Sequence, residues 1–203
     1  GGLYRGLREL RETNGESSNN IFKALGLDYR FVAKGNDLET LIDVFKDVKD
    51  IDHPIVLHIV TQKGKGYTLA EQNKEKFHWT MPFDIETGKL KAADKGPTYV
   101  GTIANYLMEQ IKVDPTVVAI CAGTPGGFGF NSEWRKAAGK QYIDVGIAEE
   151  HAIAMSSGIA KNGGKPVFNV YSTFLQRTYD QLVQDLCVNN NSAVIINHQA
   201  SVY

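Results

Sequence analysis

The stretch between Gln141 and Arg177 constrains the fold of this chain more than any other. Its sequence is QYIDVGIAEEHAIAMSSGIAKNGGKPVFNVYSTFLQR, which predicts a strand, a helix, a Gly-Gly turn, a second strand and a second helix. That order is typical of a parallel βαβ unit. Because ligands of such sheets bind at the carboxyl ends of the strands, we expect residues 149–150 and 171–177 to line one crevice.

Helices and strands alternate through the rest of the chain as well. The expected elements are helices over 3–13, 21–25, 38–48 and 98–112, and strands over 29–33, 55–61, 117–123 and 193–197. This alternation predicts an α/β fold of two mostly parallel-sheet domains, over residues 1–96 and 97–203. We interpret residues 68–96 as a long connection and residues 124–139 as an irregular glycine-rich loop.

Charge and hydropathy exclude several classes of partner. A net charge of -1 gives no electrostatic reason to expect binding to nucleic acid or to an anionic membrane. No apolar stretch approaches the ~20 residues that span a bilayer, so we expect a cytoplasmic protein. Cys121 and Cys187 have no partner at metal-ligand spacing, and we expect both to be small buried hydrophobic side chains.

Both ends of the sequence suggest that it is part of a longer protein. The chain begins with Gly-Gly and has no initial Met, and it stops soon after the apolar run AVIIN. A sheet that stopped at that strand would have an unprotected edge. We therefore expect a segment of a longer protein, and its activity belongs to that parent.

The polar residues of the central stretch allow both functional and structural interpretations. Glu149 and Glu150 at a helix start could complement the helix dipole, or one desolvated carboxylate could act as an acid or base on a cofactor. Arg177 could pair with Asp180 or bind a phosphate. A lone histidine such as His151 is more often structural than catalytic, and for His78, in an aromatic loop, packing is as expected as catalysis. The turn at 62–67, QKGKGY, is either a solvated loop or a backbone approach to a phosphate.

Several segments together resemble a known enzyme family. They are VGIAEEHA and YSTFLQRTYDQ, with LHIVTQKGKGY, KFHW and MPFD upstream in the same order. They resemble the 1-deoxy-D-xylulose-5-phosphate synthases, which are thiamine diphosphate enzymes of the transketolase superfamily. The segment YSTFLQR is closer to these synthases than to transketolases proper. The resemblance covers nearly the whole chain and implies the end of a diphosphate-binding domain followed by the start of a pyrimidine-binding domain.

The resemblance implies three cofactor-binding residues. Glu149 matches the catalytic glutamate that hydrogen-bonds N1′ of the aminopyrimidine ring of thiamine diphosphate. Phe174 matches the aromatic residue that stacks on that ring, and Tyr67 matches a tyrosine that contacts the cofactor. The Gly-Asp-Gly motif and the Asn that hold Mg²⁺ in this superfamily are missing, so we expect the metal ligands outside this chain.

It also implies the substrates and the residues that bind them. The expected reaction condenses pyruvate with glyceraldehyde 3-phosphate and releases CO₂, in a homodimer of the full-length parent. Tyr171 and Arg177 match residues that bind the phosphorylated acceptor, and His78 matches a catalytic histidine of the substrate pocket. Glu150 stands where the family has Gln, which places two carboxylates side by side and could change their proton affinity if both are buried.

Two alternatives to the synthase hypothesis stay open at the level of sequence. One is a split transketolase-like subunit that transfers two-carbon units between sugar phosphates. The other is a catalytically silent interaction module that has kept the fold. Release of CO₂ from pyruvate would separate the synthase from the first alternative, and loss of activity on replacing Glu149 would separate it from the second.

Overall fold

The structure is a computed structural model that describes residues 1–91 and 96–199. Two compact units divide the chain, residues 1–93 and residues 94–203. Residues 92–95, within the connection expected over 68–96, lie outside the described residues, as do the last four residues. No helix among the described residues is long and apolar enough to cross a membrane.

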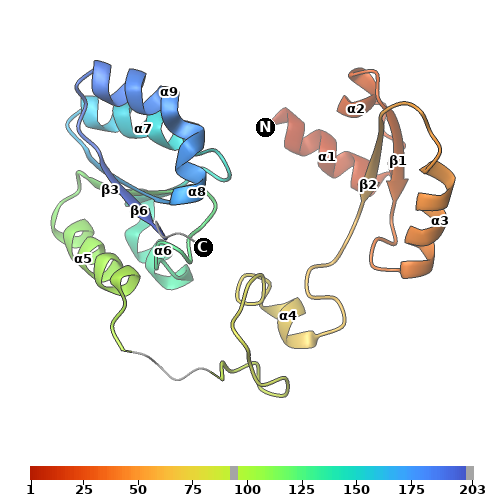
Figure 1. Ribbon diagram of the computed structural model, residues 1–203, viewed down its shortest axis with the longest axis horizontal. Coiled ribbons are helices and arrows are strands. Elements are labelled where there is room, and N and C mark those ends of the chain that lie inside the picture. The colour runs from red at the N-terminus through yellow and green to blue at the C-terminus, as the bar shows by residue number, and fades with distance from the viewer. Residues whose placement is uncertain (92–95, 200–203) are drawn as a thin grey trace. The chain divides into compact units, whose positions relative to one another are not determined.

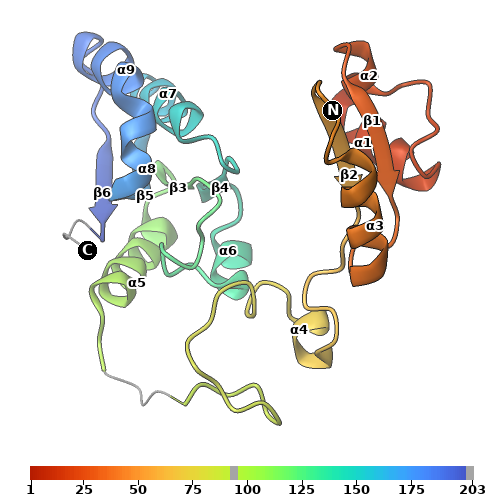
Figure 2. The same cartoon turned by 45° about the vertical axis from the view of Figure 1, so that its right-hand side comes forward.

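The first unit is built around two parallel strands (Figure 1). Its elements are α1 (Gly2–Glu12), α2 (Ile21–Ala24), β1 (Asp28–Val32), α3 (Leu38–Val48), β2 (Ile55–Ile59) and α4 (Thr68–Gln72). Helix α3 begins where the side chain of Asp37 accepts a hydrogen bond from the Thr40 amide, the N-cap arrangement that its sequence predicts. Figures 1 and 2 show α1 and α3 on opposite sides of the β1–β2 pair.

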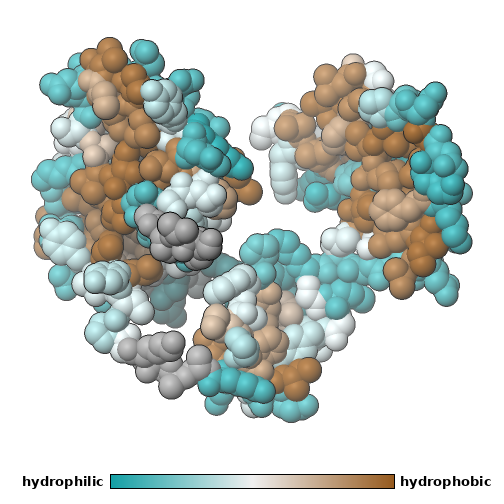
Figure 3. Space-filling view, in the orientation of Figure 1, coloured by the Kyte–Doolittle hydropathy of each residue, from teal (hydrophilic) through white to brown (hydrophobic). Residues whose placement is uncertain are grey.

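Burial in the first unit is lower than its sequence predicts. Strand β2 reads as a buried apolar run, yet each of its five residues is only partly buried. The apolar face expected on α3 is largely exposed, with Leu38 at 70%, Ile42 at 43% and Phe45 at 51% of full exposure. These side chains lie at the surface of the unit, and apolar surface shows over it in the space-filling view (Figure 3). The pattern therefore predicts the helix correctly but not the extent of its burial.

The second unit is a four-stranded parallel sheet with helices on both faces. Its elements are α5 (Tyr99–Val113), β3 (Val117–Cys121), α6 (Ser132–Ala138), η1 (Gly139–Gln141), β4 (Tyr142–Asp144), α7 (Glu149–Lys161), β5 (Lys165–Tyr171), α8 (Ser172–Leu175), η2 (Gln176–Thr178), α9 (Tyr179–Gln181), η3 (Leu182–Val188) and β6 (Val194–His198). The strands lie in the order β4-β3-β5-β6, and each pair is parallel. The predicted mostly parallel α/β fold is thereby confirmed.

Alternate side chains of β3 enter two separate cores. Val117, Ala119 and Cys121 pack with α5, α6 and the phenylalanines of the glycine-rich loop. Val118 and Ile120 pack on the other face with α7, β5 and η3, and Ala122, just after the strand, joins them. The period of two follows from strand geometry, and it explains why the run VVAIC is apolar at every position.

Three sequence predictions are wrong in detail. The segment 124–139 is not entirely irregular, because Asn131 caps the helix α6 through the amide of Trp134. Phe128 and Phe130 of that segment are buried core residues, 2% and 0% exposed. The connection 68–96 contains α4. Cys187 is exposed, whereas Cys121 is buried as expected, because Cys187 lies on a part of η3 that does not face the sheet core.

Candidate active site

The candidate site lies at the carboxyl edge of the second sheet, beside β3. The helix that follows β3, α6, packs into one core, whereas the helices that follow β4 and β5 pack into the other. Neighbouring strands therefore send the chain to opposite faces of the sheet, and open α/β sheets bind their ligands at such a point. The loop after β3, the start of α7 and the residues after β5 are the segments that meet there, as the sequence predicts.

Glu149 is the buried acid at this edge. It is the first residue of α7 and is 1% exposed, while Glu150 beside it is exposed. The two carboxylates therefore do not share a buried site, and the condition for strong coupling between them is not met. Glu149 is the acid whose environment differs from that of an ordinary helix-start residue.

Arg177 is the hydrogen-bond partner of that acid. Its Nη1 donates to Oε2 of Glu149 at 3.1 Å, and the two side chains are 46% and 2% exposed. The alternative pairing with Asp180 is not recorded among the described residues. The guanidinium also lies over the ring of Phe174, 5.6 Å from its centre, where a cation–π interaction is favourable. The structure thus brings Glu149, Phe174 and Arg177 together.

Tyr171 extends this cluster toward the end of β6. Its ring meets Phe174 edge to face with centroids 5.9 Å apart, and it lies 4.1 Å from the ring of His198. The buried Asn169 has its Nδ2 atom 3.3 Å from Nε2 of His198. Burial also lowers the pKa of His198, because it disfavours the charged imidazolium. His198 and Asn169 are therefore site residues that the sequence analysis missed.

Gly127 completes the cluster from the loop after β3. A Cβ atom at this position would lie 2.6 Å from the Tyr171 hydroxyl and 2.9 Å from Cε1 of His198. Only a residue without a side chain allows the loop to approach the two rings so closely. The glycine-rich character of the loop was visible in the sequence, but the position that requires glycine was not.

The two remaining predicted site residues lie in the first unit. The Tyr67 hydroxyl donates to the carbonyl oxygen of Ile85 at 2.8 Å, and its ring packs against Phe77 and Phe83. His78 is exposed, and among the described residues its side chain has no recorded hydrogen bond. Because the two units are separate compact bodies, the roles of Tyr67 and His78 in a site with Glu149 stay predictions.

The turn at residues 62–67 gives little support for a phosphate cradle. The amide of Gly66 donates to a carboxylate oxygen of Glu71, and the amides of Lys65 and Tyr67 donate to backbone oxygens of the same turn. Gly64 has a positive φ and abuts the backbone of Ala70, which gives it a structural reason to be glycine. The amides of Lys65, Gly66 and Tyr67 are thus already bonded within the chain and do not face a phosphate.

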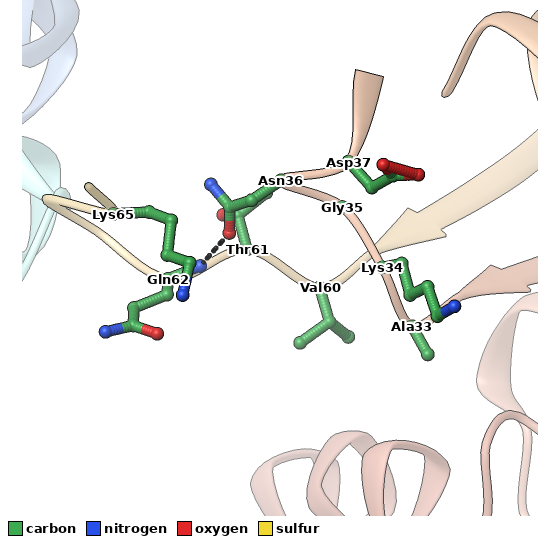
Figure 4. A pocket seen from close by; sticks show the side chains of 9 residues that line it. All are labelled: Ala33, Lys34, Gly35, Asn36, Asp37, Val60, Thr61, Gln62 and Lys65. Atoms are coloured by element: carbon green, nitrogen blue, oxygen red, sulfur yellow. Dashed lines mark hydrogen bonds between the residues drawn. The ribbon is translucent and has the colours of Figure 1, made fainter. Parts of the chain in front are cut away.

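A pocket of about 500 Å³ lies beside this turn, at the carboxyl ends of β1 and β2 (Figure 4). The Gln62 amide donates to Oδ1 of Asn36 across it at 2.6 Å. The side chains of Lys34 and Lys65 lie at opposite sides of the pocket and do not converge (Figure 4). The described residues also contain no cluster of three His, Cys, Asp or Glu side chains that could hold a metal ion.

Comparisons with known proteins agree with the geometry of the second unit. A family model described as "Transketolase, pyrimidine binding domain" matches residues 95–202, and one described as "1-deoxy-D-xylulose-5-phosphate synthase" matches residues 4–61. These matches confirm the family resemblance stated from the sequence motifs.

Relatives of known name match nearly the whole chain. The 1-deoxy-D-xylulose-5-phosphate synthase 1 of Geobacter sulfurreducens is 41% identical over 171 residues, which cover 84% of this chain and 27% of the relative. The synthase of Natranaerobius thermophilus is 39% identical over 183 residues, 90% of this chain and 29% of the relative. That of Acaryochloris marina is 42% identical over 172 residues, 84% of this chain and 27% of the relative.

The chain thus spans less than a third of the length of these relatives. The pyrimidine-binding domain model, by contrast, matches more than half of the chain, over the unit that contains Glu149, Phe174 and Arg177. This chain belongs to the transketolase pyrimidine-binding domain family.

Proposed function

We propose that this chain is a segment of a 1-deoxy-D-xylulose-5-phosphate synthase. The reaction condenses pyruvate with glyceraldehyde 3-phosphate, releases CO₂ and yields 1-deoxy-D-xylulose 5-phosphate, a precursor of isoprenoids, thiamine and pyridoxal. The observation that carries the proposal is the buried Glu149 carboxylate, which accepts a hydrogen bond from Arg177, whose guanidinium lies over the ring of Phe174. The names of the relatives support the choice of reaction.

The residues around Glu149 fit the aminopyrimidine of thiamine diphosphate. Oε2 of Glu149 accepts from Arg177, which is the only hydrogen-bond donor to this carboxylate recorded among the described residues. Oε1 therefore retains its capacity to bind a ring nitrogen. Phe174 is only partly buried and offers an aromatic face for stacking. When bound, thiamine diphosphate supplies the carbon nucleophile and the electron sink for decarboxylation.

Glu149 holds and exchanges a proton at its free oxygen in this proposal. A carboxylate removed from water interacts more strongly with a bound nitrogen than an exposed one does. Arg177 keeps the carboxylate in place from the other side, and Phe174 restricts the ring plane. Tyr67 of the first unit is proposed as a further cofactor contact, and Mg²⁺ is proposed to be held by residues outside this chain.

Tyr171, Arg177 and His78 are the proposed substrate-binding residues, and His78 also takes part in catalysis. A guanidinium carries five N–H donors, so the contact between Nη1 of Arg177 and Glu149 leaves donors for a phosphate. The half-exposed state of Arg177 supports this second task. We further propose that the parent enzyme acts as a homodimer in the cytoplasm.

The test is a product assay on the complete protein with thiamine diphosphate and Mg²⁺. Pyruvate and glyceraldehyde 3-phosphate should give CO₂ and a product with the mass of 1-deoxy-D-xylulose 5-phosphate. A transketolase-like subunit would instead transfer two carbons from xylulose 5-phosphate to ribose 5-phosphate without CO₂. If the protein is folded and binds thiamine diphosphate but forms neither product, both enzymatic hypotheses are contradicted. The catalytically silent module is then the hypothesis that remains.

A further inference from the structure

We propose that Asp144 is a positioning residue that sets the place of Glu149 at the start of α7. The proposal rests on the function proposed for Glu149 and adds the device that holds its main chain. Arg177 fixes only the end of the Glu149 side chain. The backbone of Glu149 needs a separate anchor, because a misplaced catalytic group loses its alignment with the reacting atoms.

One oxygen of Asp144 ties together the two loops next to Glu149. Oδ1 accepts from the amide of Gly123, which follows β3, and from the amide of Gly146, which follows β4, both at 2.9 Å. The strand register pairs Asp144 with Cys121, and the Val145 amide donates to the Cys121 carbonyl oxygen at 2.9 Å. The carboxylate thus continues the β3–β4 pairing beyond the last residues of the sheet.

The two loops lie close to each other where the carboxylate joins them. Gly123 and Gly146 both have positive φ, at 72° and 74°. A Cβ atom on Gly123 would lie 3.2 Å from Cγ1 of Ile147 and 3.5 Å from the Gly146 carbonyl carbon. The two loops therefore lie close together, and the two hydrogen bonds to Asp144 hold them at this spacing.

Helix α7 has no N-cap side chain that could hold its first turn in place. Its N-cap residue is Ala148, whose side chain makes no capping bond, and alanine is among the weakest N-cap residues. Only Ile147 and Ala148 separate Gly146 from Glu149. Among the described residues, Asp144 is thus the residue whose side chain holds the main chain just before α7, through the Gly146 amide.

Replacing Asp144 in the complete protein tests the proposal. Asp144→Ala should lower kcat about 30- to 100-fold, as expected when a catalytic group is misplaced by about 1 Å, while the KM for glyceraldehyde 3-phosphate changes little. Asp144→Asn keeps an oxygen that accepts both amides and should restore most of the turnover. Asp144→Glu keeps the charge but moves the oxygens, so it should lose turnover as the alanine variant does. It replaces the alanine variant in this test if that variant does not fold.

Asp114→Ala is the matched control. Asp114 precedes β3 at the opposite edge of the same sheet and also has an oxygen that accepts two bonds, from the amide and the hydroxyl of Thr116. This variant should lose stability but keep kcat. Equal kcat losses at Asp114 and Asp144, or no rescue by Asp144→Asn, would overturn the proposal.

Amide hydrogen exchange provides a readout that does not depend on activity. In Asp144→Ala, exchange in the peptide that spans residues 145–151 should accelerate, and in Asp144→Asn it should stay near wild type. Unchanged exchange in the alanine variant would overturn the positioning role. If the wild-type protein forms no product but the exchange result holds, the proposed reaction fails and the anchor for Glu149 stands.

Discussion

Nη1 of Arg177 lies 3.1 Å from Oε2 of Glu149, and this ion pair joins the half-exposed end of one residue to the buried end of another. The two residues come from the segments after β5 and β4, which the strand order places on the two sides of β3. The pair gives the buried carboxylate a counter-charge from within the same unit. It also makes Arg177 a residue with two tasks, toward Glu149 and toward the proposed acceptor.

Removing the guanidinium should destabilise the fold as well as weaken acceptor binding. Arg177→Met leaves Glu149 buried without its cation, and because Arg177 is half exposed we expect a loss of about 1–3 kcal/mol in the free energy of unfolding. Urea unfolding of the complete protein measures it. In a Glu149→Gln background the same change should cost clearly less, and equal costs in both backgrounds would show that the pair is not coupled.

The close approach of Gly127 to Tyr171 and His198 predicts a selective effect of one methyl group. Gly127→Ala places a Cβ atom 2.6 Å from the Tyr171 hydroxyl, so the rings must shift, and the KM for glyceraldehyde 3-phosphate should rise about tenfold or more. Gly126→Ala is the matched control, since a Cβ there meets nothing within 4 Å. An unchanged KM in Gly127→Ala would show that Tyr171 does not take part in binding the acceptor.

Stability of the second unit should depend on pH through Asp114. Hydrogen bonds from Lys165 and Thr116 lower the pKa of Asp114 to about 2, below its unfolded value of about 3.9. A carboxyl whose folded pKa is depressed contributes stability above its unfolded pKa and loses that contribution as pH falls toward the folded pKa. The wild type should therefore exceed Asp114→Asn in unfolding free energy near pH 7, and the difference should shrink between about pH 5 and pH 2. A difference that is constant across this range would contradict the assignment.

Much of the fold follows from the sequence because the hydrophobic periods are clear. Helix α3 has the predicted bounds, Leu38–Val48, since an Asp N-cap precedes a regular apolar repeat. The alternation of helices and strands predicts parallel sheets. The helix α6 was missed because glycines and aromatic residues before Asn131 resemble a loop, and its short length gives little periodic signal.

The candidate site was only partly predictable for a different reason. Motif resemblance picked out Glu149, Phe174, Tyr171 and Arg177, and the rule on strand ends placed them at one edge. Neither the resemblance nor this rule could show that Arg177 pairs with Glu149, because that contact depends on the strand order. His198 and Asn169 carry no motif, and only the register of β5 and β6, which pairs Tyr171 with His198, brings them in.

The central claim is that Glu149 is the carboxylate on which turnover depends, and its isosteric replacement tests that claim most directly. In the complete protein with thiamine diphosphate and Mg²⁺, Glu149→Gln should lower the rate of CO₂ release from pyruvate with glyceraldehyde 3-phosphate at least ~100-fold. Glu150→Gln, which changes the exposed neighbour, should release CO₂ at close to the wild-type rate. If Glu149→Gln keeps more than about half of the wild-type rate, the acid–base role assigned to Glu149 is wrong.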